Sequence, residues 1–487
     1  MRDAAQRLKW IAEELTGVEL PVRLRAWDGS EAGPPGGAVL VLRRRRALRH
    51  LLGSPGELGL ARAWVAGDLD VEGDLYEGLA RIAGIVWDAG IIWAEAAGTA
   101  GTAPGPASAS ARTEAPGAAG ASRVRGALRT LRALRQPRAR AAAAALVRLA
   151  RPLPPPRPPR EEIRARGRLH LHTQRTDRRA VTHHYDVGND FYALVLGPSM
   201  VYSCAYWPGE PAEPAAPGDL AEPAEPGPTL EEAQRDKLEL VCRKLGLRPG
   251  MRLLDVGCGW GSMAVHAARE HGVRVVGVTL SAEQAAYARR RVAKAGLADR
   301  VEIRVQDYRD VADGPYDAIS SIGMAEHVGS VRYLAYARAL YELLAPGGRL
   351  LNHQIGRRPQ SAEEAYHVDR FIDAYVFPGG ELAPLGTTVT LLERAGFEVR
   401  DVESLREHYG PTLRRWVSNL EAEWPRAVRL AGYGRARVWR LYMAACALAF
   451  EGNSIGVNQV LAVRTPQPGE PGTPGDSGLP LRARGWN

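Results

Sequence analysis

Short apolar runs alternate with longer amphipathic segments through the second half of the chain. Apolar runs bounded by polar residues or glycines predict strands, and the segments between them carry apolar residues at helical spacing. Strands that alternate with helices in this way form a mostly parallel sheet covered by helices. We therefore expect an α/β fold with a sheet of seven strands at residues 252–256, 273–278, 301–306, 316–322, 349–354, 397–404 and 459–463.

Residues 1–95 show a different, mixed pattern. One apolar run at 38–42 predicts a strand, and apolar residues at helical spacing predict helical segments at 48–51, 58–65 and 75–93. Five tryptophans lie in this part of the chain, and we expect most of them to pack in its core. The pattern predicts a small mixed α+β N-terminal domain.

Alanine, glycine, proline and arginine dominate residues 96–165. This composition predicts a linker between the first domain and a large domain at 166–465, which a disordered tail at 466–487 follows. Within the linker, residues 124–149 have leucines at helical spacing and predict a basic helix that Pro137 breaks or kinks.

The positive charge is concentrated in one block. Between residues 123 and 179, 17 arginines stand against three acidic residues, so the rest of the chain is net acidic although the whole has a formal charge of +9. Such a block suits an anionic surface, and we expect a transient contact with an anionic membrane and none with nucleic acid. A solvated tether would explain the same composition.

Three absences limit the class of protein. No apolar run approaches the ~20 residues that span a bilayer, the first ten residues lead to no cleavage-site pattern, and the four cysteines have neither metal-ligand nor disulfide-framework spacing. We expect a cytoplasmic protein without a bound metal that associates peripherally with the inner face of the membrane. A homodimer is one assembly that the sequence allows.

One stretch carries a nucleotide-binding pattern. Residues 253–262, LLDVGCGWGS, place an apolar run and an acid before Gly257, Gly259 and Gly261 and lead into a helical pattern. Glycines at these places allow a tight strand-to-helix turn and let a ligand lie against the backbone. A P-loop is excluded because no lysine follows the glycines, and the spacing is not the G-x-G-x-x-G of dinucleotide sites. It resembles the first motif of class I S-adenosylmethionine-dependent methyltransferases.

In an open parallel sheet the ligand lies at the carboxyl ends of the strands, so the residues after each strand are candidates. After the second strand, Thr279 stands where a generic methyltransferase of this class has an acid for the ribose hydroxyls. Either the ligand is no nucleoside, or Thr279 and Gln284 share this task through neutral hydrogen bonds. After the third strand, Asp307 could accept from an adenine amino group and Tyr308 could cover the base, although Asp307 could equally be a helix N-cap.

Several motifs together resemble one lipid-modifying family. GCGWG, GVTLSAEQ and QDYRD, preceded by HHYDVGNDFY and YSCAYW and followed by GMAEHVG, PGGRLLNHQIG and HYGPTLRRW, are similar to motifs of the cyclopropane-fatty-acyl-phospholipid synthases and the mycolic acid cyclopropane synthases. The resemblance covers roughly residues 182–464, and LGLARAWVAGDLDVEG resembles the family's N-terminal lipid-side domain. It implies a class I methyltransferase (Rossmann-like) fold with two cofactors, S-adenosylmethionine and bicarbonate.

The resemblance also implies site residues. Those expected to bind S-adenosylmethionine are Tyr202, Ser203, Asp255, Gly257, Cys258, Gly259, Trp260, Gly261, Thr279, Leu280, Gln284, Gln306, Asp307 and Tyr308. Those expected to hold bicarbonate as the base are Cys204, Glu326, His353, the backbone of Ile355, and Tyr409. Taken singly, each of the latter has an ordinary structural explanation, such as a helix-start acid or a core histidine. Their joint occurrence favours the chemical role.

The implied reaction needs a dry pocket, because an alkene is a weak nucleophile and the cation left by methyl transfer must be kept from water. Aromatic faces can stabilise such a cation, and the candidates are Tyr185, Phe191, Trp260, Phe371 and Tyr409. Residues 366–377 could line a tunnel for an acyl chain or form an ordinary amphipathic helix. A buried Glu326 would repel bicarbonate unless His353 is charged or a proton is shared.

We therefore expect an enzyme like the cyclopropane-fatty-acyl-phospholipid synthases, which transfers a methylene from S-adenosylmethionine to the cis double bond of an unsaturated acyl chain of a phospholipid. A different fate of the same cation would give a methylene- or methyl-branched chain. The alternative from another class is a lipid-surface binding protein that keeps the fold but has lost turnover.

Overall fold

The computed structural model describes residues 3–88, 137–150, 154–163, 174, 184–185, 187–209, 227–360 and 369–466. The chain forms two compact units. Unit 1 consists of Met1–Arg164, Pro359–Val376 and Tyr433–Leu448, and unit 2 consists of Ala165–Arg358, Phe377–Gly432 and Ala449–Asn487. The sequence pattern places all of 166–465 in one domain, whereas the structure groups two stretches of that range with unit 1.

Unit 1 is built around a small mixed sheet. Its strands lie in the order β2-β1-β3-β4, with β1 parallel to β3 and the other pairs antiparallel. The described elements are α1 (Ala4–Thr16), β1 (Arg23–Arg25), β2 (Glu31–Ala32), β3 (Val39–Leu42), α2 (Arg46–Gly53), α3 (Glu57–Val65), β4 (Leu69–Glu72), α4 (Leu75–Asp88), α6 (Pro137–Ala150), α13 (Arg370–Tyr375) and the part of α17 (Tyr433–Glu451) that ends at Leu448. The predicted end of α4 at residues 89–93 lies outside the described residues.

Helix α6 belongs to the core of unit 1. Its Leu149 and Ala150 are buried in one cluster with Leu8 and Ile11 of α1. Residues 124–136 of the predicted helix lie outside the described residues, so the break expected at Pro137 stays a prediction. The described part of this segment packs like a core helix rather than a tether.

The late stretch 433–448 is held in unit 1 by a buried arginine. Arg437 on α17 is 2% exposed, and its guanidinium donates to the carboxylate of Asp70 at 3.1 Å and to the carbonyl oxygen of Trp64 at 2.6 Å. The indole N–H of Trp64 donates in return to the carbonyl oxygen of Arg437 at 2.9 Å. A buried arginine with its partners complete fixes residues far apart in sequence next to one another.

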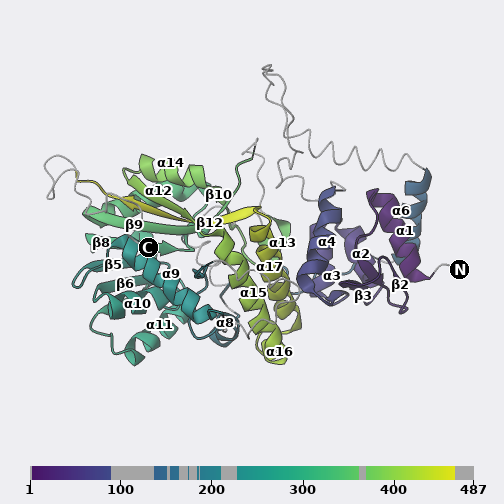
Figure 1. Cartoon of the computed structure of the whole chain (residues 1–487), viewed down its shortest axis with the longest axis horizontal. Helices are drawn as coiled ribbons and strands as arrows, with labels where there is room; N and C mark the ends of the chain where they lie inside the picture. Colours follow the sequence, from purple (N-terminus) through teal and green to yellow (C-terminus); the bar gives the residue numbers. More distant parts are fainter. Residues whose placement is uncertain are drawn as a thin grey trace, which may run out of the picture. The chain divides into compact units, whose positions relative to one another are not determined.

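Unit 2 has the predicted α/β architecture (Figure 1). Its eight-stranded sheet runs β11-β12-β9-β8-β5-β6-β7, with β10 beside β9. Strands β5 to β9 are parallel, and β12 pairs antiparallel with both neighbours. The strands are β5 (Arg252–Val256), β6 (Arg274–Thr279), β7 (Val301–Val305), β8 (Tyr316–Ile322), β9 (Leu344–Arg357), β10 (Ala383–Pro384), β11 (Glu398–Ser404) and β12 (Ile455–Val463).

Helices cover both faces of this sheet, as Figure 1 shows. Residues of α9, α10 and α11 share one buried cluster with one face, and residues of α12 and α14 share another cluster with the opposite face. The helices of unit 2 are α8 (Asn189–Leu196), α9 (Leu230–Leu245), α10 (Ser262–Glu270), α11 (Ala282–Lys294), α12 (Ser330–Leu343), α14 (Leu385–Arg394), α15 (Arg406–Ala422), α16 (Trp424–Ala431) and the short 3-10 turns η2 (Tyr308–Asp310) and η3 (Ala325–His327). Because β5 to β9 run parallel, their carboxyl ends lie at the same edge of the sheet.

Two strands of this sheet are longer than their apolar runs predict. β9 extends from Leu344 to Arg357 and β12 from Ile455 to Val463, and the two pair along their whole common length. Among the described residues, no helix is both long and apolar enough to cross a membrane.

Candidate active site

The turn after β5 is bound to the end of the neighbouring strand. The backbone N–H groups of Gly257 and Cys258 both donate to the carbonyl oxygen of Val278 on β6, at 2.9 and 3.0 Å. Gly257 has φ +76°, and a Cβ there would lie 3.3 Å from the Cβ of Met324. A side chain at this position would therefore be strained and crowded. The glycine lets the chain turn within contact distance of the loop after β8.

Side-chain hydrogen bonds also hold this turn in place. The hydroxyl of Ser262 donates to the carbonyl oxygen of Ser199 at 2.7 Å, and Arg291 on α11 donates to Ser262 at 2.8 Å. The indole N–H of Trp260 donates to the side chain of Asn189 at 2.7 Å. These bonds connect the glycine motif with the two aromatic segments that precede it in the chain.

A cavity that is partly open to solvent lies at this edge of the sheet. Every residue that the sequence predicts to bind S-adenosylmethionine lines it, except Gly261. The lining consists of Tyr185, Met200, Val201, Tyr202, Ser203, Lys237, Leu238, Asp255, Val256, Gly257, Cys258, Gly259, Trp260, Ser262, Met263, Val278, Thr279, Leu280, Gln284, Gln306, Asp307, Tyr308, Arg309, Ile322, Gly323, Met324, His327, Val328 and Arg332.

Gly261 has a packing role instead. Its φ is +79°, and an added Cβ would lie 3.0 Å from the Cβ of Ala288 on α11. The glycine therefore lets the start of α10 approach α11 closely. At Gly259, in contrast, no atom lies within 4 Å of an added Cβ.

Polar side chains at one end of the cavity are already paired. Thr279 donates from Oγ1 to Oε1 of Gln284 at 2.9 Å, and both residues line the cavity. Asp307 accepts from the backbone N–H of Arg309 at 3.0 Å, and Arg309 also holds its carboxylate at 2.7 Å. Asp307 is thus the N-cap of the short helix η2, and it also lines the cavity.

Glu326 and Ile355 are brought into contact beside the cavity. Oε1 of Glu326 accepts from the backbone N–H of Ile355 at 2.7 Å, while Oε2 is buried without a hydrogen-bond partner among the described residues. Burial raises the pKa of Glu326 to about 7. Met324 and His327, on either side of Glu326 in the chain, line the cavity. The Ile355 N–H is therefore engaged by Glu326 rather than open to a bound anion.

His353 lies two residues before Ile355 on β9 and is 2% exposed. Burial lowers its pKa to about 3, and the nearby charges of Lys237 and Lys244 act in the same direction. Its Nε2 is buried without a hydrogen-bond partner among the described residues. The ring is neutral at physiological pH, so of the two ways to avoid repulsion of an anion, a proton on Glu326 is the one that this site favours.

Cys204 contacts the residue that precedes α15, and Tyr409 lies within that helix. The thiol of Cys204 donates to the carbonyl oxygens of Ala205 at 3.2 Å and Leu405 at 3.6 Å, and burial raises its pKa. Tyr409, in the first turns of α15, is 7% exposed and lies 4.4 Å from the ring of Phe450. A thiol with a raised pKa is a hydrogen-bond donor rather than a nucleophile. None of the five residues predicted to hold bicarbonate lines the cavity.

The candidate cation-stabilising aromatics divide into three groups. Tyr185 and Trp260 line the cavity with their rings 5.6 Å apart and nearly perpendicular. Phe191 is fully buried in the core of unit 2, and Tyr409 packs as described above. Phe371 lies on α13 in unit 1, and residues 366–368 of the predicted tunnel segment lie outside the described residues. The structure thus brings two of the five to the cavity.

Several lining residues are absent from the sequence prediction. They include Lys237, Arg309, Met324, His327 and Arg332. Lys237 has a signal in the sequence, because it occupies a buried position of the amphipathic helix α9 where an apolar residue would be expected. Arg309, Met324 and His327 follow the predicted strands and could have been found by extending each candidate segment by a few residues, whereas Arg332 lies farther on, in α12.

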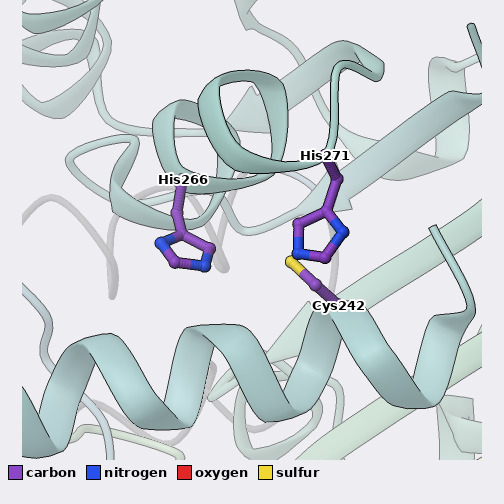
Figure 2. Close-up of side chains that lie close together, drawn as sticks. All are labelled: Cys242, His266 and His271. Atoms are coloured by element: carbon purple, nitrogen blue, oxygen red, sulfur yellow. The ribbon is translucent and has the colours of Figure 1, made fainter. Parts of the chain in front are cut away.

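A separate cluster of potential metal ligands lies between α9 and α10. Cys242, His266 and His271 have ligand atoms within 4.8 Å of one another (Figure 2). Oε2 of Glu239 lies 3.2 Å from Nε2 of His266 and 3.0 Å from Nε2 of His271, so both rings already share one acceptor. The lining of the cavity contains none of these residues. We interpret the cluster as a set of hydrogen bonds that holds α10 against α9.

Comparison with known proteins identifies the family. Residues 172–460 match the family model described as mycolic acid cyclopropane synthetase. A probable fatty acid methyltransferase of Mycobacterium tuberculosis is 39% identical over 476 residues, which are 95% of this chain and 94% of that protein. The chain belongs to the mycolic acid cyclopropane synthetase family. The cyclopropane-fatty-acyl-phospholipid synthase of Escherichia coli K12 is 38% identical over 281 residues, 58% of this chain and 66% of that protein.

A solved structure of the family agrees in fold. The mycolic acid cyclopropane synthase CmaA1, complexed with SAH and CTAB, is 34% identical, covers 59% of this chain and 98% of its own, and superposes with a TM-score of 0.52. The predicted family and the class I methyltransferase fold are therefore confirmed. The chain is an S-adenosylmethionine-dependent C-methyltransferase, and its family relatives support methylation of a lipid as the class of reaction.

The two glycines with different surroundings make a matched pair of substitutions. We expect Gly261→Ala to lower the free energy of unfolding by about 1–3 kcal/mol, because the methyl group meets Ala288 and the residue has a positive φ. Gly259→Ala should cost about 1 kcal/mol for its φ alone, but its methyl group enters the cavity and should weaken binding of S-adenosylhomocysteine. Denaturant unfolding and calorimetric titration measure the two effects. An equal loss of ligand affinity in both variants would contradict the packing role of Gly261.

Proposed function

We propose that this enzyme adds a methylene from S-adenosylmethionine across the cis double bond of an unsaturated acyl chain of a phospholipid, with bicarbonate as the base that closes the ring. Met324 and His327, on either side of Glu326 in the chain, line the cavity. The observation that carries the proposal is the contact between Glu326 and Ile355. It joins a buried acid at the end of one strand to the next strand, beside the space where the cofactor residues converge. Relatives named cyclopropane synthases support the same activity.

The residues near Glu326 fit a small polar guest. Oε2 of Glu326 and Nε2 of His353 are both buried and lack hydrogen-bond partners among the described residues, and such atoms are costly to leave unpaired. When bound there, bicarbonate would accept the proton released on ring closure. Glu326 in its protonated form would donate to it, and Ile355 would act by fixing the orientation of Glu326. Tyr409 and Cys204 would each offer a hydrogen-bond donor to the ion.

Water exclusion is the remaining requirement, and the side chains around the cavity support it. Trp260 is 3% exposed, and it packs with Tyr185 and Tyr192 in an aromatic cluster. Aromatic faces in this position would stabilise a cation on an acyl chain while keeping water away from it.

The substrate would come from an anionic membrane surface on the cytoplasmic side. Support for this part of the proposal is compositional, since the arginine-rich block at 123–179 suits anionic head groups. Most of that block lies outside the described residues.

A branched product is the second candidate, and the names of two relatives favour it. The proteins of Mycobacterium tuberculosis and Pseudomonas putida, 39% and 44% identical, are both called probable fatty acid methyltransferases. The same cavity and the same first cation would serve either product. Loss of a proton from the new methyl group closes the ring, whereas a hydride shift followed by proton loss gives the methylene-branched chain.

Lipid analysis distinguishes these products. Purified enzyme with S-adenosylmethionine, bicarbonate and vesicles of a cis-unsaturated phospholipid should release S-adenosylhomocysteine and yield acyl chains that are one CH₂ heavier. A cyclopropane chain lacks an alkene and resists mild alkene hydrogenation, whereas a methylene-branched chain takes up hydrogen. Heavier chains that hydrogenate would favour the branched product. Release of no S-adenosylhomocysteine with any lipid would leave only the lipid-binding alternative.

The pH dependence of turnover tests the role of Glu326. Its pKa of about 7 means that the carboxyl group is protonated below neutrality and ionised above it. If the protonated form acts, kcat/KM falls as the pH rises above about 7. Glu326→Gln should lower kcat by no more than about 10-fold, because its amide N–H can still donate to the bicarbonate ion, and it should remove this alkaline decline because an amide does not ionise. Affinity for S-adenosylhomocysteine should stay unchanged.

The glutamine variant should fold normally, because its side-chain oxygen can still accept from the Ile355 N–H. An unchanged thermal unfolding midpoint is therefore the control. An alkaline decline that persists in Glu326→Gln, or a wild-type rate that rises through this pH range, would contradict the assignment. Tyr409→Phe should likewise slow turnover without weakening the binding of the cofactor.

A further inference from the structure

The hydrogen bonds between α9 and α10 bring four metal-binding side chains together. Glu239 and Cys242 lie one helical turn apart on α9, whereas His266 lies on α10 and His271 caps its end. The ligand atoms of Cys242, His266 and His271 all lie within 4.8 Å of one another. Figure 2 shows that these three side chains project toward one another from the two helices. The set offers a thiol, two imidazoles and a carboxylate.

The distances within the set are close to those of a tetrahedral zinc site. Oε2 of Glu239 lies 3.2 Å from Nε2 of His266 and 3.0 Å from Nε2 of His271. Nitrogen and oxygen ligands about 2.0 Å from Zn²⁺ are about 3.3 Å apart in a tetrahedron, and a sulfur ligand lies about 3.6 Å from its neighbours. The limit of 4.8 Å for Cys242 and the histidines is about 1.2 Å longer. Side-chain rotation closes a difference of this size.

Burial alone does not explain the set. Cys242 is fully buried, is in no disulfide and belongs to an apolar cluster of unit 2. A buried cysteine commonly packs as a small apolar residue, but this does not account for two imidazoles and a carboxylate next to it. The side chains of His266, His271 and Glu239 are 11%, 17% and 30% exposed. An ion can therefore reach the thiol from solvent.

The spacing of these residues along the chain also fits a zinc site. Two residues separate Glu239 from Cys242, and four separate His266 from His271. Structural zinc sites commonly have the pattern C-x₂₋₄-C followed by H-x₃₋₅-H. Glu239 stands where this pattern has its first cysteine, which is why cysteine spacing alone does not predict the site.

We propose that Glu239, Cys242, His266 and His271 bind one Zn²⁺ ion that joins α9 to α10. Thiolate, imidazole and carboxylate are the usual ligands of zinc. Four protein ligands leave no open position for a substrate, and the cavity lining contains none of them. The ion therefore stabilises the fold and takes no part in methyl transfer. On binding, the Cys242 thiol releases its proton to solvent, and each imidazole keeps its single proton on the nitrogen that faces away from the ion.

Cobalt is the probe, because Co²⁺ occupies tetrahedral zinc sites and its absorption spectrum reports its ligands. The full chain, freed of metal with a chelator under reducing conditions, should take up one equivalent of Co²⁺. The spectrum should show the strong visible bands of tetrahedral cobalt and a near-ultraviolet charge-transfer band from thiolate to cobalt. Zn²⁺ should displace the cobalt, and this competition gives the Kd of Zn²⁺.

Substitutions of single ligands test the set. Loss of a group that only supports a ligand costs about 10- to 100-fold in metal affinity, so Cys242→Ser should raise the Kd of Zn²⁺ by about 100-fold or more and abolish the charge-transfer band. His271→Gln should raise the Kd similarly, although its amide can still donate to Glu239. Glu239→Gln should raise the Kd by about 10-fold or more and keep the charge-transfer band.

Cys446→Ser is the matched control, because Cys446 is a free cysteine on α17 and lies outside the set. This variant should keep the charge-transfer band and the wild-type Kd. An ion that binds the folded state stabilises it, so Zn²⁺ should raise the thermal unfolding midpoint of the wild type and of Cys446→Ser. The midpoint of Cys242→Ser should not respond to Zn²⁺.

Three outcomes would overturn the proposal. A cobalt spectrum without the charge-transfer band, or a band that persists in Cys242→Ser, would show an ion bound elsewhere. Uptake of neither metal by the wild type would show that the four side chains form hydrogen bonds only. Binding of S-adenosylhomocysteine and turnover do not depend on this site, so each of these outcomes leaves the proposed function unaffected.

Discussion

Two hydrogen bonds to the carbonyl oxygen of Val278 fix the turn after β5, on which the cavity of unit 2 depends. The N–H groups of Gly257 and Cys258 both donate to Val278, so the chain leaving β5 is bound to the end of β6 before it enters α10. A backbone acceptor shared by two consecutive donors leaves the turn little freedom to move outward. The positive φ that this requires explains why glycine is needed at the turn. The cavity floor, the direction of α10 and the approach of Met324 all depend on it.

Around that turn, burial changes the protonation of the polar side chains in one consistent direction. The pKa values of Glu326 and Asp255 rise, and those of His353 and Lys237 fall. Each shift favours the neutral form, and desolvation is the leading cause in every case. Glu326, Asp255 and Lys237, with pKa values of about 7, 6 and 8, can accommodate charged ligands by gaining or losing single protons close to neutral pH. This property suits a reaction that consumes a cationic donor and passes through a second cation on a lipid chain.

The sequence determines much of unit 2 because its signals are local. Strands β5 and β8 match their predicted bounds, and the glycine motif predicts the turn. The long strands β9 and β12 were underestimated, since their ends are stabilised by pairing with each other rather than by apolar runs. Strands β1 and β2 of unit 1 are too short to show alternation. Helix α1 was missed although Asp3 caps its start and Gly17 ends it, two signals that the sequence does contain.

At the site itself, residue identity was more predictable than residue pairing. The sequence names Glu326 and Ile355, but only the fold shows that they bond to each other. Gly261 belongs to the same motif as Gly257, yet its neighbour is Ala288 on another helix, which no spacing rule reveals. Lys237 was overlooked because a lysine on a helix normally faces water.

Unit 1 is assembled from three separate stretches of the chain, which affects both its folding during synthesis and its division into fragments. The ribosome releases the first stretch long before Arg437 exists, so until then Asp70 has no Arg437 guanidinium beside it and the indole N–H of Trp64 lacks its acceptor on that residue. Unit 1 can therefore reach its final packing only after most of unit 2 has been synthesised. Cutting the gene between the two units would yield an N-terminal fragment that lacks part of its own interior.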